Sequence, residues 1–151
     1  MISFPDTSFL CAFYREQVHS SRADAWMETR TTSLPVSTLL LLEFRQSTRF
    51  QVRLHRLDRT RGFAEREAQG ILQNLQSDLT NGILELRPVD WPDVHQTAER
   101  LSATHTIAQG HRFADILHVA TAIHLAASEF LTFDENQRRL AEAEGLKVPV
   151  R

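Results

Sequence analysis

The sequence predicts an α/β fold of three layers, α/β/α, in which helices cover both faces of a central, mainly parallel sheet. Short apolar runs that suit buried strands alternate along the chain with longer segments whose apolar residues recur at helical spacing. The chain has 151 residues, 42% of them hydrophobic, which is enough for one domain with a full core. We therefore expect residues 1–151 to form a single domain.

The first part of the chain is expected to alternate strands with helices that begin at hydroxyl-bearing residues, since serine and threonine favour helix N-caps. In order, we expect a strand over 2–4, a helix capped by Thr7 or Ser8, a helix from Ser20 or Ser21, a strand over 34–36, and a helix from Ser37 or Thr38 to Val52.

The second part continues the alternation, and glycine and proline mark its breaks. We expect an amphipathic helix over 63–79, ended by Asn81-Gly82, and then a strand over 83–86. Next come a helix from Trp91 or Pro92 to about Ser102, capped by Asp90, a break at Gly110, and a helix over 113–127. A strand over 130–133, a helix over 135–144 ended at Gly145, and a short strand at Val148 complete the order.

Acidic residues stand at the margins of four of these apolar segments, where a carboxylate is costly unless something pairs with it. Asp6 and Asp134 each follow a predicted strand, Asp115 opens a predicted helix, and Glu43 interrupts an apolar helical run. Sites in open parallel sheets lie beyond the carboxyl ends of the strands. We therefore expect the four carboxylates to converge on one pocket, although each also has a simpler role open to it as a helix cap, a helix-terminus charge or a solvated side chain.

A convergent set of carboxylates suits Mg²⁺ or Mn²⁺, because these hard cations prefer oxygen ligands. A bound ion of this kind lowers the pKa of a water ligand and stabilises charge on a phosphoryl group. Without a metal, close carboxylates repel one another and one or more should hold a proton. The set therefore predicts metal-dependent hydrolysis of phosphodiesters.

At this level the chain resembles a PIN-domain ribonuclease of the VapC toxin type, and the resemblance covers nearly its whole length. The third and fourth motifs carry it most strongly. The matching segments are Asp6-Thr7-Ser8-Phe9-Leu10, Glu43-Phe44, Phe113-Ala114-Asp115-Ile116-Leu117-His118-Val119-Ala120-Thr121-Ala122, Phe130-Leu131-Thr132-Phe133-Asp134-Glu135-Asn136-Gln137 and Gly145-Leu146-Lys147-Val148. One departure is Pro5, where the family more often has an apolar or aromatic strand residue.

The resemblance implies a metal-dependent endoribonuclease, the toxin of a toxin–antitoxin pair, that forms homodimers and is inhibited by a small VapB-like antitoxin. It assigns Asp6, Glu43, Asp115 and Asp134 to the Mg²⁺ or Mn²⁺ pocket. Asp6 and Asp115 are the most direct ligands it implies, with the other two acting through water or on a second ion.

Other residues are candidates for accessory roles. Thr7 and Asn136 lie close enough in sequence to the acids to join the pocket, and His118 lies on the Asp115 side of its helix. For gripping an RNA backbone, the candidates are Arg45, Arg49, Arg53 and Arg112. Thr7 has helix capping as its alternative, and Asn136 has a role in the first turn of its helix. For Arg112 the alternative is a structural or antitoxin-contact role, and for the other three arginines it is a solvated helix face.

The composition of the chain excludes several kinds of site and location. Cys11 is the only cysteine, so an intrachain disulfide and a cysteine-rich zinc site are excluded. The apolar run 39–42 is too short to span a bilayer, and a cytoplasmic protein is expected. The formal net charge of −2 shows no broad attraction for nucleic acid. A DNA-directed nuclease or phosphatase, or a non-catalytic module whose acidic pocket receives a cationic partner, stays open as an alternative.

Overall fold

The computed structural model describes residues 1–150, and within them the strands form two parallel pairs. Strand β1 (Ser3–Pro5) pairs with β4 (Glu129–Leu131), with Phe4 opposite Phe130. Strand β2 (Leu34–Val36) pairs with β3 (Leu84–Leu86), with Pro35 opposite Glu85. The parallel arrangement is therefore confirmed. The strand expected at Val148 is reduced to one parallel bridge, between Glu129 and Lys147.

Two prolines explain why the strands form separate pairs although β1 and β2 lie side by side. The Asp6 N–H donates to Leu131 O, so the even-numbered residues of β1 direct their backbone groups toward β4. The Leu34 N–H donates to Ile83 O, which places the even-numbered residues of β2 toward β3. Pro5 and Pro35 therefore face the gap between β1 and β2, and neither has an N–H to donate across it. The departure from the family pattern at Pro5 therefore affects this gap and not the pairing of β1 with β4.

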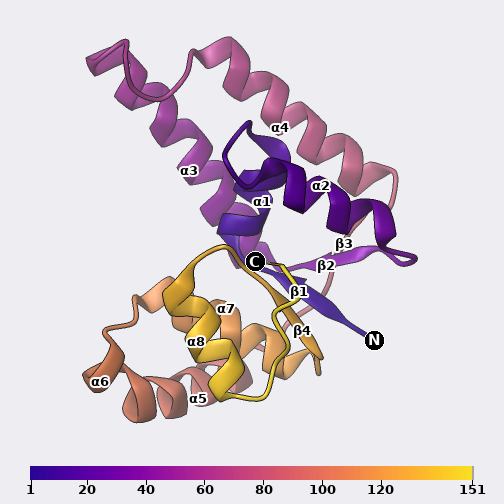
Figure 1. Ribbon diagram of the computed structural model, residues 1–151, viewed down its shortest axis with the longest axis vertical. Coiled ribbons are helices and arrows are strands. Elements are labelled where there is room, and N and C mark those ends of the chain that lie inside the picture. Colours follow the sequence, from indigo (N-terminus) through magenta and orange to yellow (C-terminus); the bar gives the residue numbers. More distant parts are fainter. Residues whose placement is uncertain (151) are drawn as a thin grey trace.

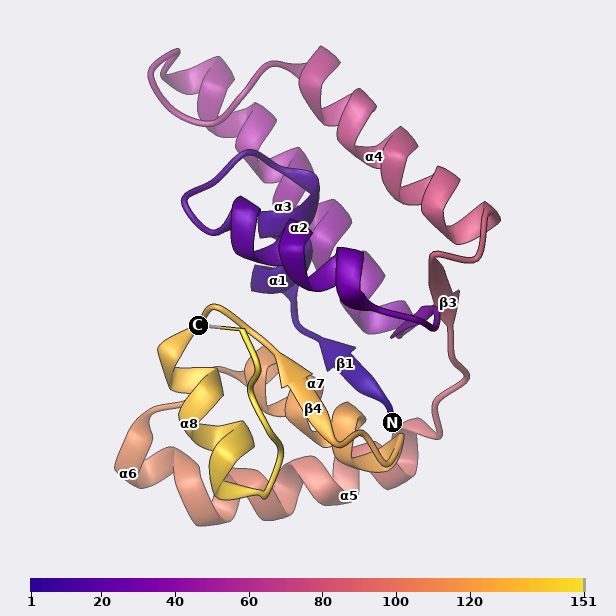
Figure 2. The ribbon, with the colours of Figure 1, turned by 45° about the vertical axis from the view of Figure 1, so that its right-hand side comes forward.

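Helices lie on both sides of the strands, as expected for three layers. Figures 1 and 2 show α1 to α4 gathered on one side and α5, α7 and α8 on the other. In chain order the helices are α1 (Thr7–Tyr14), α2 (Ser20–Thr29), α3 (Thr38–Leu57), α4 (Glu65–Thr80), α5 (Trp91–Leu101), α6 (Ile107–Gln109), α7 (Phe113–His124) and α8 (Glu135–Ala143). The strands and inner helix faces enclose a core whose largest fully buried side chains are Phe4, Phe9, Phe44 and Phe130.

Most element boundaries follow the predictions, and the differences have local causes. The cap of α1 is Asp6, whose carboxylate accepts from the Phe9 N–H, and not the hydroxyl of Thr7 or Ser8. Helix α3 ends at Leu57, more than one turn beyond the predicted end at Val52. A π-helical turn over Ser102–Thr106, which apolar spacing did not predict, joins α5 to α6, and Gly110 (φ 70°) then ends the segment.

None of the helices within residues 1–150 combines the length and the apolar character needed to cross a membrane.

Candidate metal centre

The chain brings each of the four predicted acids to an end or an inner face of an element. Asp6 follows β1 and caps α1, and Asp134 follows β4 and caps α8. Asp115 lies in the first turn of α7, and Glu43 lies in the second turn of α3. The carboxyl ends of β1 and β4 are neighbours because the two strands are parallel, so segments far apart in the sequence meet at this edge.

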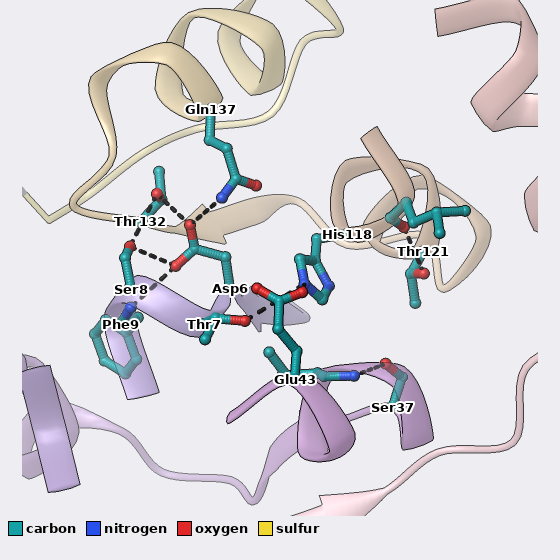
Figure 3. Close-up of polar contacts among 12 residues, drawn as sticks. Asp6, Thr7, Ser8, Phe9, Ser37, Glu43, His118, Thr121, Thr132 and Gln137 are labelled. Carbon is teal, nitrogen blue, oxygen red and sulfur yellow. Dashed lines mark hydrogen bonds and ion pairs between the residues drawn. The ribbon is translucent and has the colours of Figure 1, made fainter. Parts of the chain in front are cut away.

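Asp6 is fully buried, and neighbouring donors satisfy both of its carboxylate oxygens (Figure 3). Oδ1 accepts from Ser8 Oγ at 2.6 Å and from the Phe9 N–H at 2.9 Å. Oδ2 accepts from Gln137 Nε2 at 2.6 Å and from the Thr132 hydroxyl. Asp6 thus ties α1 to the end of β4 and to α8.

Burial raises the pKa of Asp6 to about 6, although the hydrogen bonds from Ser8, Thr132 and Phe9 act in the opposite direction. The Gln137 side chain is also buried, and its Oε1 has no hydrogen-bond partner within residues 1–150. A rotation of the Gln137 amide by half a turn would present Oε1 to a protonated Asp6. The network therefore has an acceptor for the proton that burial favours.

Glu43 and His118 form the second polar contact of the site. His118 is fully buried, and its Nε2 lies 2.9 Å from Glu43 Oε2 and 3.4 Å from Thr7 Oγ1. Burial alone would raise the pKa of Glu43, but the hydrogen bond and charge of His118, helped by Thr7 and Arg112, bring it below its ordinary value. In Figure 3, the Glu43 carboxylate lies against the imidazole of His118, beside the Asp6 network.

Asp115 differs from Asp6 because it has charged neighbours and no donor. Its half-buried carboxylate accepts no hydrogen bond from any residue in 1–150. Burial raises its pKa, the charges of Asp134 and Glu43 raise it further, and Arg112 and His118 offset part of the effect. Asp115, Asp134 and Glu43 thus lie within electrostatic reach of one another, and a cation placed among them would relieve their repulsion.

Three carboxylates, from Asp115, Asp134 and Glu43, combine their negative charges at this place. Carboxylate oxygens are ligands that suit a divalent cation. Within residues 1–150, however, no group of three or more His, Cys, Asp or Glu side chains stands at ligand spacing. Asp6 is also set apart from the others, because its oxygens point at Ser8, Thr132 and Gln137. The carboxylates of Asp115, Asp134 and Glu43 therefore act on one another through their charges. The fourth predicted acid, Asp6, is held in a separate hydrogen-bonded network.

Of the predicted accessory residues, Thr7 and Arg112 interact with the acids and, in the part of the chain that the structure describes, Asn136 does not. Thr7 reaches Glu43 through His118, whereas Asn136 is half-buried in the first turn of α8, where the structure gives its side chain no hydrogen bond to residues 1–150. Arg112 is exposed, and its charge acts on both Asp115 and Glu43.

Two of the three predicted α3 arginines line a groove whose walls include none of the four acids. Arg45 is half-buried, and Arg49 and Arg53 are exposed. Arg49 and Arg53 line a groove of about 440 Å³ between α3 and α4, which Val52, Ala68 and Leu72 also line.

Two residues of the Asp6 network, Thr132 and Gln137, were not among the predicted site residues. A signal for Gln137 is present in the sequence, because Asp134-Glu135-Asn136-Gln137 matches the spacing of a capping box, with a carboxylate at the cap and an amide three residues later. The Gln137 N–H does donate to Asp134 Oδ1, at 2.9 Å. Its side chain turns instead to Asp6, which the local pattern does not reveal.

Comparison with known proteins places these observations in a wider context. The PIN domain family profile matches residues 3–143. The crystal structure of VapC20 from Mycobacterium tuberculosis, described as a toxin that cleaves the sarcin–ricin loop, has a TM-score of 0.68 at 18% identity, over 99% of each chain. The structure of FitAcB from Neisseria gonorrhoeae has a TM-score of 0.62 at 15% identity, over 97% of this chain and 96% of that one. At these identities the likeness shows a shared fold. No curated protein sequence matches the chain.

Proposed function

The chain belongs to the PIN domain family, and on that premise we propose that it is a metal-dependent endoribonuclease acting as the toxin of a toxin–antitoxin pair. The observation that carries the proposal is the field at Asp115, where burial and the charges of Asp134 and Glu43 raise the pKa of a carboxyl that has no donor within residues 1–150. A site of this kind is poised for a cation. The shared fold with a toxin that cleaves RNA supports the choice of substrate.

In this proposal Asp115, Asp134 and Glu43 would hold Mg²⁺ or Mn²⁺, and Asp6 would complete the set. A cation bound there would supply a polarised water and would neutralise charge on the scissile phosphate. His118 fixes the carboxylate of Glu43 through the 2.9 Å contact at Nε2, and the exposed Arg112 provides a cation for the phosphate. Asp6 would contribute an oxygen after one of the donors in its network, such as Gln137 or Thr132, gives up its hydrogen bond.

Chelation tests whether the reaction needs a metal. A panel of substrates separates the proposed ribonuclease from its alternative, a DNA-directed nuclease or phosphatase. We expect EDTA to abolish RNA cleavage, Mg²⁺ or Mn²⁺ to restore it, and matched DNA and phosphomonoester substrates to remain uncut. The measurement is a cleavage assay on the three substrates, followed by sequencing of the RNA ends produced. Equal cleavage of DNA would indicate a nuclease of broader substrate range, and cleavage of RNA in excess EDTA would remove the metal from the mechanism.

One observation favours a second function, a non-catalytic module whose acidic pocket receives a cationic partner. The donors that already occupy both oxygens of Asp6 leave the pocket short of a ligand in this conformation. Calorimetric titration with Mn²⁺ distinguishes the two. Heat of binding that is lost in Asp115→Asn supports the nuclease, whereas no binding together with no cleavage supports the module.

Substitution of His118 should reveal its role in positioning Glu43. His118→Leu removes the donor to Glu43, and we expect the cleavage rate to fall by about 10- to 100-fold, as for other residues that orient a metal ligand. His118→Gln restores an N–H of similar reach and should recover part of the loss. Cleavage rates are compared at saturating metal, after thermal unfolding has shown that both variants fold. Equal rates for the leucine and glutamine variants would contradict a positioning role.

The same proposal extends to the partners. We propose that a VapB-like antitoxin inhibits the enzyme, that the enzyme forms a homodimer, and that it acts on RNA in the cytoplasm. The α3 residues Arg45, Arg49 and Arg53, together with Arg112, remain the proposed contacts to the RNA backbone.

A further inference from the structure

We propose that His19 and Arg22 form a stacking platform that holds one base of single-stranded RNA beside the acidic site. The inference rests on the nuclease function proposed above and adds the place where a base is held. His19 immediately precedes α2, and Arg22 lies in the first turn of that helix. Neither residue carries the resemblance of the chain to its family, and neither belongs to the acidic site.

The platform is the outer end of a stack of rings that begins in the core. The imidazole of His19 lies parallel to the ring of Phe133, with 4.7 Å between centroids and 9° between planes. Phe133 is in turn stacked on Phe9, at 6.0 Å and 10°. Phe9 is fully buried, whereas Phe133 and His19 are half-buried. A histidine held flat at the surface in this way is a surface on which an unpaired base can stack.

Arg22 adds a cation to the same place. Its guanidinium carbon lies 5.4 Å from the centroid of Phe133, and one of its nitrogens contacts His19 Nδ1. The side chain is exposed, and no carboxylate of residues 1–150 forms an ion pair with it. Arginine in this setting can both stack beside a base and meet its phosphate.

The platform is joined to the acidic site through the backbone. Phe133 immediately precedes Asp134, and its N–H donates to Ser8 Oγ at 2.9 Å. Ser8 in turn donates to Asp6 Oδ1 at 2.6 Å. A base stacked on His19 would therefore be held at a fixed position relative to Asp6 and Asp134.

Stacking of a base on His19 would supply RNA binding that the net charge of the chain does not. With a formal net charge of −2, the protein lacks a broad positive field to gather RNA. Stacking on aromatic rings depends little on sequence or on net charge, and it contributes to binding for each base held. A platform beside the pocket would supply binding that long-range electrostatics does not.

The test uses a short single-stranded RNA that carries 2-aminopurine, a fluorescent base whose emission falls when it stacks. Binding is measured in the Asp115→Asn background, so that the RNA is not cut. We expect His19→Leu to weaken binding by about tenfold and to abolish the fall in emission. His19→Phe keeps a flat ring and should retain both. The matched control is His95→Leu on α5, whose imidazole lies 6.4 Å from the ring of Trp91 and should have no effect.

The outcomes separate this inference from the function on which it rests, because cleavage of unlabelled RNA by the wild type is measured in parallel. The parent protein in these binding measurements is Asp115→Asn. If the wild type cleaves RNA and the His19→Leu variant binds RNA as tightly as the parent does, the platform is overturned and the nuclease function stands. Quenching that depends on His19, in a protein that cuts no RNA, supports the platform and removes the nuclease function. Absence of RNA binding by the parent overturns the platform.

Discussion

Replacing Asp115 with asparagine should lower the rate of RNA cleavage by more than about 100-fold and leave the folded protein at least as stable as the wild type. The two effects have one cause. The carboxylate of Asp115 accepts no hydrogen bond from residues 1–150, and burial, Asp134 and Glu43 all raise its pKa. Asparagine removes that repulsion from the apo protein and removes a charged oxygen from the cation. Cleavage rate at saturating Mn²⁺ and thermal unfolding in EDTA measure the two effects separately.

Asp24→Asn is the matched control, because Asp24 is an exposed aspartate on α2. It should change neither cleavage nor stability. Two results would count against the role assigned to Asp115. Cleavage by Asp115→Asn within tenfold of the wild type would remove it from the reaction. A clear loss of stability would instead make it a structural residue of α7.

Replacing Asp6 with asparagine should stabilise the metal-free protein at neutral pH. Burial raises the pKa of Asp6 from 3.8 to about 6, a shift that corresponds to roughly 3 kcal/mol. Because the folded state binds this proton more tightly than the unfolded state, the contribution is fully present below pH 3.8 and is lost as the pH rises through 6. Asparagine carries no charge at any pH, and the unpaired Gln137 Oε1 can accept from its amide.

The gain in stability should therefore grow with pH. We expect the free energies of unfolding of wild type and Asp6→Asn in EDTA to be similar at about pH 3.5, below the ordinary pKa of 3.8, and the variant to be more stable by up to a few kcal/mol at pH 8. Denaturant unfolding at both pH values provides the measurement. Asp90→Asn, which changes an exposed capping residue of α5, should shift the free energy by no more than about 0.5 kcal/mol. A difference between Asp6→Asn and wild type that is constant with pH would contradict burial as the cause.

Local sequence patterns predicted the elements well because the signals that define them are local. Leu34–Val36 is bounded as expected, Asp90 caps α5, and Gly145 follows α8 with a φ of 85°. The π-helical turn over Ser102–Thr106 was missed, because it interrupts an otherwise helical run without a glycine or proline to mark it. The separation of β1 from β2 depends on two prolines, Pro5 and Pro35, facing the same gap, and their alignment is known only once the strands are placed.

The candidate site was only partly readable from the sequence. Charged residues at the margins of apolar segments identified the acids, and Asp115, Asp134 and Glu43 do share one electrostatic field. The partners of Asp6 were not readable, since Thr132 and Gln137 lie more than 120 residues away in the chain. The contact of His118 with Glu43 joins residues 75 positions apart.

The sequence by itself determined which segments are strands or helices, that the strands run parallel, and which acids are candidates for a metal. Those properties follow from periodicity, caps and turn residues, which act over a few neighbouring positions. Only the tertiary structure decided that the Asp6 carboxylate is saturated by neutral donors while Asp115 has none within residues 1–150. The hydrogen-bond partners and the pKa of a buried carboxyl depend on which distant side chains surround it, and that is fixed by packing.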